Sequence, residues 1–593
     1  MIELWIHPSV LLFVGALVLP LLPVSVRRVA LLGVPALVLA LVLLQPVGNF
    51  GQIQFLDWGL EFGRVDALSR VFAIIMALMC LLGSLYALKV NDVGQHIAAW
   101  VYVGGSLGVI FAGDLLVLFL FWELMALSSV FLIWARRSPE SLAAGFRYLL
   151  VHTAGGLALL AGIVAHGMSQ NGDFSFNAFA AAEANWAVWL ILIGILLNAA
   201  VPPLHAWLPD AYPAATFSGS VFLSAFTTKT AVYALCRGFA GFEILLVLGV
   251  VMALYGVIYA FLANDPRRLL SYHIVSQVGF MVAGVGIGTA MAVNGAIAHA
   301  FAHILYKGLL FMGTGAVLYQ TGRSKFTELG GLYQKMPWTM LMTLIGALSI
   351  SAVPLFSGFV SKSMTIAAGY EAHHYWAAYL LMLASIGTFV SIGLKLIYQI
   401  WFGERRADAS TWEKAKDPGW NMMAAMGITA FLCFLIGVYP HLLYQLLPHA
   451  VDYQPFTSYH LSETILLLSF AALGFYLLRR QMAPKASNCL DLDWPYRKGG
   501  GLVSWMVQKP LQSLDQRYSR LHESAGIRPL MESAGASARF DNRRIDGAVD
   551  GLARLIRNLG TGMRVLQRGS LQQNLTLAFA SLAVLLFLFY LFT

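Results

Sequence analysis

Three ionisable side chains follow one another at four-residue intervals inside an apolar stretch of this chain. They are His299, His303 and Lys307, in a segment that runs from about 290 to 319. In an α-helix this spacing places side chains on one face at steps of about 6 Å, so a proton passing between them needs bridging water. A charge at the centre of a membrane helix costs at least about 2.5 kcal/mol and is usually functional. The pattern predicts a proton path.

Two other interpretations fit the same residues. Histidines four residues apart can bind a metal ion, but no third ligand lies nearby, and no Glu follows His299 as in the helix of zinc proteases. We therefore expect no metal site. Lys307 could instead form a buried ion pair with a carboxylate and take no part in transport, and this alternative stays open.

The rest of the chain has the composition of a membrane protein. Its 593 residues are 59% hydrophobic and only 11% charged, with a mean hydropathy of +0.72, which excludes a soluble domain. We predict an all-α polytopic membrane protein with about 16 transmembrane helices. The apolar runs lie at 8–24, 28–46, 68–88, 97–112, 114–135, 147–167, 187–203, 217–237, 242–263, 270–289, 292–319, 337–360, 374–402, 420–440, 461–479 and 571–592.

The positions of Lys and Arg predict the orientation of these spans. The connections that follow odd-numbered spans carry Arg27, Arg28, Lys89, Arg136, Arg137, Arg267, Arg268, Arg323, Lys325, Arg405 and Arg406. Those that follow even-numbered spans carry little besides Arg64, Arg70 and Arg237. Because positive loops stay in the cytoplasm, both termini should lie outside a plasma (inner) membrane of prokaryotic type. No basic residue precedes the first span, so we expect no cleaved signal peptide.

Excess positive charge is concentrated near the C-terminus. Residues 479–570 hold sixteen Lys or Arg against eight Asp or Glu, in a chain of net charge +9. Apolar residues at helical spacing alternate there with arginines, which predicts amphipathic helices on the membrane surface. Gly and Ser cluster at 499–504 and 524–537, which predicts turns or linkers. We expect segment 481–570 to meet anionic lipid headgroups, and we expect no nucleic acid partner.

Prolines interrupt one apolar segment in each half of the central region. Pro202 and Pro203 lie in the first half and Pro354 in the second. Proline removes a backbone donor and clashes with the preceding turn, so both helices should break. Broken helices in corresponding positions are typical of transporters built from repeats.

Further ionisable residues lie within or beside the spans: Glu123, Lys229, Lys362 and Lys395. A lone buried acid and a lone buried base are each costly, so we expect Glu123 and Lys229 to face each other as an ion pair. Lys395 fits equally well with a side chain that extends to the membrane interface. The histidines His152, His205 and His273 lie at span ends or at the first break, where we expect each to bond a carbonyl group.

These motifs resemble those of a known family. They are Phe121-Trp122-Glu123-Leu124-Met125, the series from Pro203 to Ala211, Lys229-Thr230-Ala231-Val232-Tyr233, Asp265 with Arg268 to Tyr272, His303 with Lys307, and Ser357-Gly358-Phe359 before Lys362. In this order, over roughly 95–405, they are similar to the proton-translocating antiporter-like subunits of Mrp-type Na+/H+ antiporters, respiratory complex I and membrane-bound hydrogenases. The D-type branch of the Mrp antiporters looks most similar. The basic segment before the last span is similar in layout to the lateral-helix ending of some complex I subunits.

The resemblance implies two inverted five-helix repeats with broken helices, and a division of the chain into parts. They are N-terminal helices at 1–95, the first antiporter-like half at 96–265, the second half at 266–440, an additional helix at 441–480, the basic amphipathic segment at 481–570 and the C-terminal helix at 571–593. It also implies a pair formed by Glu123 and a lysine, and an axis with a terminal site. The axis would comprise Lys229, His299, His303 and Lys307, and the terminal site Lys362.

One position departs from the family pattern. The family usually has a lysine seven residues before the motif histidine, which is His205, and this chain has Asn198 there. Asparagine carries no proton and no charge. Either Lys229 takes over the pairing with Glu123, or this half of the path is altered or idle.

Three hypotheses about function follow. The first is a proton-translocating subunit of a multi-subunit cation/proton antiporter, with Na+ as the exchanged cation and other membrane subunits as partners. The second is a proton-pumping membrane module of a redox complex. The third is a membrane scaffold with a vestigial channel, which Asn198 favours. The sequence has no haem, flavin or nucleotide signature, so we expect no cofactor and no enzymatic chemistry in this chain itself.

Overall fold

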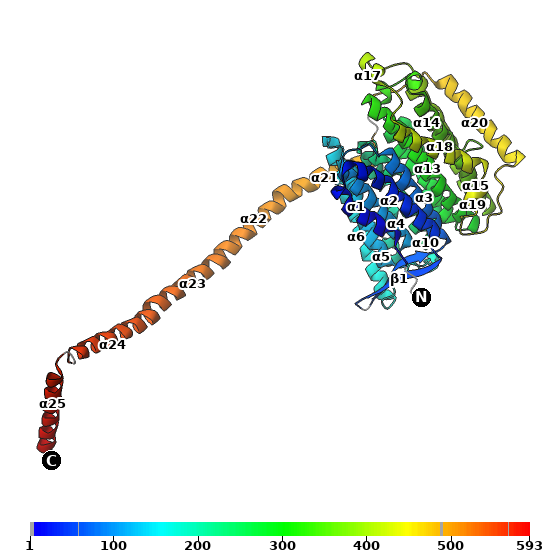
Figure 1. Cartoon of the computed structure of the whole chain (residues 1–593). Coiled ribbons are helices and arrows are strands. Elements are labelled where there is room, and N and C mark those ends of the chain that lie inside the picture. The colour runs from blue at the N-terminus through cyan, green and yellow to red at the C-terminus, as the bar shows by residue number, and fades with distance from the viewer. Residues whose placement is uncertain (1–4, 57, 487–489, 567–568, 593) are drawn as a thin grey trace. The chain divides into compact units, whose positions relative to one another are not determined.

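The computed structural model describes residues 5–56, 58–486, 490–566 and 569–592. The chain forms two compact units, residues 1–493 and 494–593 (Figure 1). Twelve helices in the described part of the chain are long and apolar enough to cross a membrane, so this is a multi-pass membrane protein. A helix lies at each of the sixteen predicted spans, whereas the number that cross the membrane stays a prediction.

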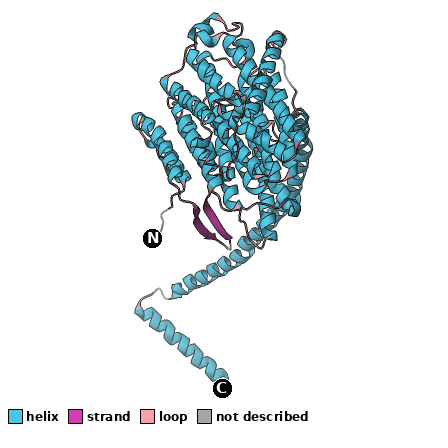
Figure 2. Cartoon of the chain, turned by 90° about the vertical axis from the view of Figure 1, so that its right-hand side faces the viewer, coloured by secondary structure: helices cyan, strands magenta, loops and turns pink. Residues whose placement is uncertain are grey.

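The N-terminal region contains three long helices and a β-hairpin that the apolar pattern did not predict. The helices are α1 (Pro8–Val18), α2 (Val24–Leu44) and α3 (Ala67–Tyr86), and the strands are β1 (Gly48–Phe55) and β2 (Trp58–Val65). The strands pair in antiparallel register from Gly48 opposite Val65 to Phe55 opposite Trp58. Figure 2 shows the hairpin at one end of the helical bundle.

The next helices form the two halves of the bundle. The first half has α4 (Val93–Phe111), α5 (Leu115–Trp134), α6 (Pro139–Ser169), α7 (Trp186–Asn198), α8 (Trp207–Ala214), α9 (Gly219–Ala225), α10 (Thr227–Gly238) and α11 (Glu243–Leu262). The second half has α12 (Pro266–Ile287), α13 (Ala290–Thr321), α14 (Pro337–Ile350), α15 (Ser357–Glu371), α16 (Tyr375–Thr388) with the π-helical stretches Phe389–Leu396 and Tyr398–Phe402, α17 (Ala409–Lys414) and α18 (Trp420–Val438). Both predicted breaks are confirmed, between α7 and α8 and between α14 and α15.

Loops that follow odd-numbered spans meet at one end of the bundle, which we call the basic end. Arg136 donates to the carbonyl oxygen of Pro213 at 2.8 Å, and Arg267 donates to that of Ala215 at 3.0 Å. Short helix α17 belongs to this end and lies at the top of the bundle in Figure 1.

Loops that follow even-numbered spans meet at the opposite end with the hairpin. The Gly113 N–H donates to the Glu61 carbonyl at 2.9 Å, and the Phe179 N–H to the Gly238 carbonyl at 2.8 Å. Asp66 begins α3 here and accepts two hydrogen bonds from Arg237, at 2.8 and 2.9 Å. The alternation of basic loops along the sequence is therefore an alternation between the two ends of the bundle.

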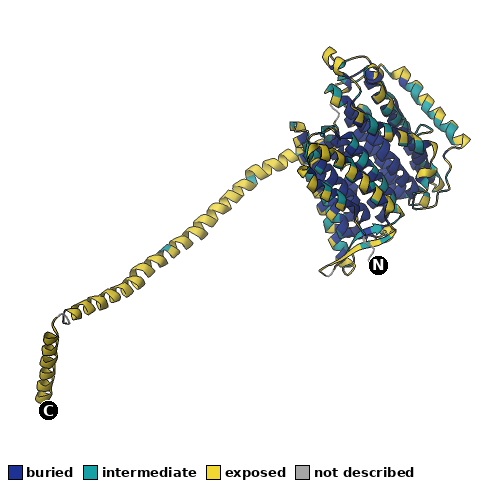
Figure 3. Cartoon of the chain, in the orientation of Figure 1, coloured by how far each residue is buried: buried dark blue, intermediate teal, exposed yellow. Residues whose placement is uncertain are grey.

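Helices α11 and α12 approach each other closely and join the two halves. Glycines line their interface, and a Cβ at Gly249 would overlap the backbone nitrogen of Ala283, as one at Gly286 would overlap that of Leu246. Small residues allow such close backbone packing between membrane helices. In the most apolar stretch of α12 and of α13, 94% of the residues are buried. Figure 3 shows the buried residues gathered in the middle of the bundle.

The last helices of the first unit are the short α19 (His441–Tyr444) and α20 (Ser458–Leu478). In the most apolar stretch of α20 only 6% of the residues are buried. The second unit is helical from Trp494 to Leu566 and again over α25 (Leu571–Phe592). Its first part comprises α21 (Trp494–Met506), α22 (Gln512–Leu521), α23 (Arg528–Phe540) and α24 (Asp546–Leu566), joined by π-helical stretches. The amphipathic helices are confirmed. The predicted turns at 499–504 and 524–537 are wrong, because the helical penalty of about 1 kcal/mol per glycine is only a weak bias.

Candidate proton path

Helix α13 carries the ionisable stripe as one uninterrupted helix. His299, His303 and Lys307 are all fully buried. The ring centroids of His299 and His303 lie 6.2 Å apart, which matches the step expected for a spacing of four residues. Tyr306 lies beside both rings, with centroid distances of 6.2 Å to His299 and 5.3 Å to His303.

Polar side chains from neighbouring helices reach one end of this stripe. His299 Nδ1 lies 3.1 Å from Ser361 Oγ on α15, and its Nε2 lies 3.3 Å from the Tyr306 hydroxyl. Tyr306 also donates to Gln277 Oε1 on α12 at 3.5 Å. His299 is thus tied to the second broken helix by direct contacts.

The middle of the stripe has no protein partners. Neither ring nitrogen of His303 makes a hydrogen bond to any described residue, and neither does Lys307 Nζ. Native proteins rarely leave buried polar atoms unsatisfied, and ordered water usually satisfies those that lack a protein partner. Three unsatisfied nitrogens in successive turns of one helix therefore mark a polar site where water would complete the contacts between the side chains.

Lys229 lies on α10, within electrostatic range of His303 and Lys307. It is fully buried, and its Nζ donates to the carbonyl oxygen of Ser224. That carbonyl is free because the helix is interrupted at Phe226, between α9 and α10.

The Tyr102 hydroxyl of α4 fills this interruption. It accepts from the Thr227 N–H at 2.9 Å and lies 2.6 Å from the Thr227 hydroxyl. An inserted side chain is a recognised cause of a break in the helical hydrogen-bond ladder. No proline or glycine marks this break in the sequence, so sequence reasoning missed it.

The predicted ion pair between Glu123 and Lys229 is wrong. Glu123 is half-buried on α5, where its carboxylate packs against Gly156 of α6. Its Oε1 has no hydrogen-bond partner among the described residues, and the Lys229 ammonium is held by Ser224 instead. A buried base is costly to leave unpaired, as expected, but Lys229 binds the carbonyl that the helix interruption frees and not the carboxylate of Glu123.

Lys362 lies at the second break, early in α15. Its Nζ donates to the Ile350 carbonyl at 2.8 Å and lies 4.9 Å from the centroid of the Phe280 ring. Ile350 is the last residue of α14, so this lysine binds a carbonyl at the helix C-terminus, where a cation is favoured.

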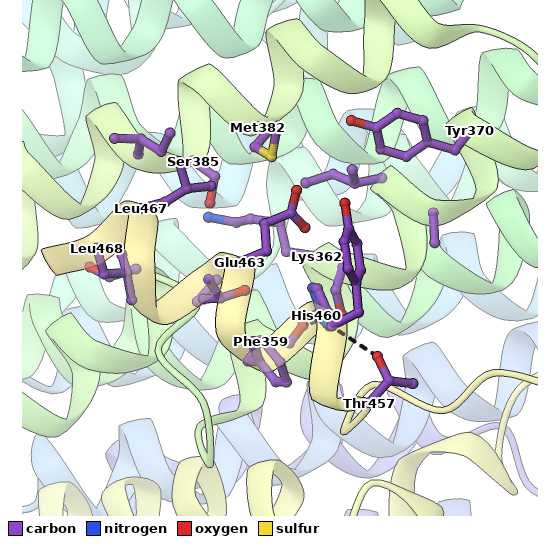
Figure 4. Close-up of a pocket in the computed structure, with 18 of the residues that line it drawn as sticks. Phe359, Lys362, Tyr370, Met382, Ser385, Thr457, His460, Glu463, Leu467 and Leu468 are labelled. Carbon is purple, nitrogen blue, oxygen red and sulfur yellow. Dashed lines mark hydrogen bonds between the residues drawn. The ribbon is translucent and has the colours of Figure 1, made fainter. Parts of the chain in front are cut away.

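A cavity of about 430 Å³ opens beside Lys362, between α15, α16 and α20. Figure 4 shows Lys362, Tyr370, His460 and Glu463 around it. Polar and ionisable groups from α20 thus join the terminal lysine. The sequence did not single out His460 or Glu463, because they lie outside the region that carries the motifs.

Different side chains lie at the first break, between α7 and α8. Asn198 ends α7, is fully buried and leaves both polar atoms of its side-chain amide without a described partner, as does the neighbouring His152 with its two ring nitrogens. His205 does not bond a carbonyl as expected. Its Nε2 lies 3.2 Å from Oδ1 of Asp491, a residue that sequence reasoning counted with the basic segment.

One more histidine differs from expectation. His273 bonds the Ser391 hydroxyl at 2.6 Å rather than a carbonyl group. Lys395 is buried, and its Nζ donates to the carbonyls of Phe261 and Ala263 at the end of α11, the second at 3.1 Å. The alternative of a side chain that extends toward the membrane interface stays open. His273 lies within electrostatic range of Lys307, Lys362 and Lys395, so the polar axis continues from α13 toward this lysine.

Residues 112–388, which contain both breaks and the stripe of α13, match the family described as NADH:quinone oxidoreductase/Mrp antiporter, TM. This region is therefore similar in sequence to the antiporter-like membrane subunits. The match begins before Glu123 and ends after Lys362, so it encloses the six residues expected to carry protons. Assignment of the chain to the D-type branch of the Mrp antiporters stays a prediction.

Two curated relatives of this chain are named for different kinds of complex. Hydrogenase-4 component B of Escherichia coli (strain K12) is 28% identical over 420 residues, which cover 63% of this chain and 62% of the relative. Na(+)/H(+) antiporter subunit A1 of Staphylococcus aureus is 29% identical over 496 residues, which cover 74% of this chain and 61% of the relative. The chain thus spans less than two thirds of the length of either relative.

A solved structure shares the fold over nearly the whole chain. It is a chain of the membrane-bound sulfane sulfur reductase (MBS), an archaeal respiratory membrane complex, with a TM-score of 0.69 at 24% identity. The similarity covers 94% of this chain and 99% of that chain. The similarity in fold therefore extends beyond the motif-bearing region.

Proposed function

We propose that this chain is the proton-translocating subunit of a multi-subunit cation/proton antiporter, with Na+ as the exchanged cation. The observation that carries the proposal is the stripe of α13, where His303 and Lys307 are fully buried and have no described partner for their nitrogens. A membrane protein that keeps an unpaired lysine in its interior bears a large cost. Proton transfer is the use that fits a lysine between two other buried amines.

The path we propose runs from Lys229 through His303 and Lys307 toward Lys362. Lys307 lies within electrostatic range of Lys229 and Lys362. Like charges in a low-dielectric interior repel strongly, so protonation of one amine favours release from the next. Water between the side chains carries the proton across each step, because the steps are too long for direct transfer.

The two ends of the path follow from the fold. Uptake at the first break would draw on the basic end, and release would use the cavity beside Lys362, where Tyr370 and Glu463 add polar groups. The absence of a contact between Glu123 and Lys229 removes the opening of that pair from the mechanism. Glu123 instead serves as a separate protonatable group of the first half, because its Oε1, which has no partner among the described residues, can bind a proton or a water molecule.

A redox-driven proton pump is the second candidate. Two observations favour it: a hydrogenase component is among the relatives, and the fold of a respiratory complex subunit covers 94% of this chain. The same path would serve in that complex. The partners would then be redox subunits, and this chain would contribute proton transfer alone.

Cation/proton exchange in inverted membrane vesicles tests the proposal. The chain is produced alone and with the proteins encoded beside it, as wild type, Lys307→Ala and Glu123→Gln. We expect exchange only in the presence of the neighbours, complete loss with Lys307→Ala and a severe decrease with Glu123→Gln. Lys416→Ala removes an exposed lysine and is the matched control, which should exchange at the wild-type rate.

The amount of each variant in the membrane is measured in parallel. Full exchange by Lys307→Ala would contradict the path. If the wild type exchanges no cation in either setting but copurifies with redox subunits, the second candidate replaces the first. Both candidates place other membrane subunits around this chain, and anionic vesicles that bind segment 481–570 would support the lipid contact.

A further inference from the structure

We propose that His205 and Asp491 form a proton-holding pair at the first break, in which His205 binds the proton and Asp491 is the positioning residue. This inference rests on the proposed function and adds a site to it. The two residues lie 286 positions apart in the sequence, and their side chains meet inside the first unit with an Nε2 to Oδ1 distance of 3.2 Å.

The Asp491 carboxylate is held by three side chains. The hydroxyl of Tyr255 on α11 donates to Oδ1, the hydroxyl of Tyr272 on α12 donates to Oδ2 at 2.6 Å, and His205 completes the set. The Asp491 side chain is 3% exposed and that of His205 is 0% exposed. A buried carboxylate with this many donors is a built site, since each bond offsets part of its desolvation.

The carboxylate is ionised in this site. Burial alone raises the pKa of Asp491, but the hydrogen bonds from His205, Tyr255 and Tyr272 outweigh burial and hold the pKa below its usual range. An ionised carboxylate can only accept hydrogen bonds. The nitrogen of His205 that faces it, Nε2, is therefore the protonated one.

The other ring nitrogen of His205 is free to act. Nδ1 is buried and has no partner among the described residues. The same is true of the Asn198 amide and of both ring nitrogens of His152, which lie at the same break. Ordered water usually satisfies buried polar atoms that lack a protein partner, and such water would connect His205 to the interior.

Binding and release of the proton form and break one N–H bond of His205. A hydrated proton forms an N–H bond at Nδ1 of the neutral ring, and the resulting imidazolium keeps its Nε2–H bond to the Asp491 carboxylate. Release breaks the same Nδ1–H bond and returns the proton to water. The carboxylate compensates the positive charge while the proton is held, so no isolated charge is buried.

The position of the pair suits uptake from the basic end. Tyr272 is six residues after Pro266, the first residue of α12 at the basic end, so Asp491 sits roughly 9 Å inside the bundle. The Arg268 guanidinium lies over the Tyr272 ring, 6.0 Å from its centroid. The groups that face the pair are thus Tyr255, Tyr272 and Arg268.

The test measures exchange as a function of pH in the vesicles used for the proposed function. Asp491→Asn keeps the shape of the side chain and removes its charge, so we expect exchange at neutral pH to fall about tenfold and the pH optimum to move to more acidic values. Asp491→Glu should restore most of the rate. His205→Gln should lose as much as Asp491→Asn, and the double variant no more than either, because the two residues act as one unit.

Asp452→Asn makes the same chemical change at an exposed site and should leave the profile unchanged. If Asp491→Asn reaches the membrane in small amounts, Tyr272→Phe replaces it: removal of one donor should lower exchange about twofold to threefold and shift the optimum in the same direction. A wild-type rate and profile in Asp491→Asn or Tyr272→Phe, or additive losses in the double variant, would overturn the pair. Lys307→Ala in the same vesicles separates the two proposals, since its full activity would mean that the proposed function has failed.

Discussion

The two broken helices of this protein occupy corresponding places in the two halves, yet different groups fill them. At the second break the ammonium of Lys362 lies 2.8 Å from a carbonyl at the end of α14 and faces a cavity. At the first break the corresponding helix ends in Asn198, which has no charge and no described partner, and a histidine binds a carboxylate from a distant loop.

This difference shows that a break supplies a polar place in the membrane without deciding which group uses it. A free carbonyl at a helix end favours a cation, as Lys362 illustrates. A turn with an unpaired histidine favours a countercharge instead, and the chain brings Asp491 to it. Substitutions at and around the two breaks test whether proton transfer depends on the lysine at the second break and on the histidine and its carboxylate at the first.

Among substitutions at the two breaks, replacement of Lys362 should have the largest effect. Lys362→Met fills a similar volume without a charge, so exchange should fall about 100-fold or more because the terminal proton site is lost. Vesicle exchange measures the rate, and Lys416→Met at an exposed site is the control. A decrease smaller than that of Asn198→Leu would reverse the ranking of the two breaks.

Asn198→Leu should have the next largest effect. Leucine has a similar size but displaces water from the first break, so exchange should fall about tenfold while the protein still inserts. Asn198→Gln keeps the amide and should retain most of the rate. Equal rates for Asn198→Leu and the wild type, measured in the same vesicles, would show that the first break does not conduct.

Tyr102→Phe should have a moderate effect and sharpens the comparison, because an inserted tyrosine interrupts the helix of Lys229 in the first half. Loss of the hydroxyl leaves buried polar groups of Thr227 unpaired, which costs about 1–3 kcal/mol of stability. We expect a lower melting temperature in detergent and exchange reduced a few-fold. Unchanged stability would mean that another group fills the interruption.

Asp66→Asn should leave exchange unchanged and reduce stability only. Partial burial raises the pKa of Asp66, but hydrogen bonds and charge from Arg237 outweigh it and lower the pKa overall. The ionised pair therefore stabilises the fold above the unfolded pKa of about 3.9, and this contribution is lost as pH falls through the folded value. Melting measured against pH should show the wild type and variant converging in acid, and an altered exchange rate would contradict a purely structural role.

Much of the fold could be predicted because its signals are local. Apolar length places the helices, and proline places both breaks. The uninterrupted α13 follows from the absence of proline between Ala290 and Thr321. The hairpin was not predicted although Gln52 to Phe55 alternates polar and apolar residues, because its strands of eight residues are much shorter than a membrane span of about 20 residues.

The site was predictable only where its residues share one helix. His299, His303 and Lys307 lie on α13, so helical spacing alone gives their geometry. Partner choice across helices was not predictable: Lys229 binds a carbonyl freed by a tyrosine of another helix, and His205 binds Asp491 across 286 positions of sequence. No pattern in a single sequence encodes such contacts.

The glycine-lined contact of α11 and α12 has a consequence for how the protein is made. These helices are consecutive in the chain and pack backbone to backbone, so they can associate as a hairpin as soon as both have left the ribosome. That hairpin already contains Tyr255 and Tyr272, which later receive Asp491. The two tyrosines would thus be in place before Asp491 is synthesised, and the segment that carries Asp491 would bind to an already assembled pair of helices.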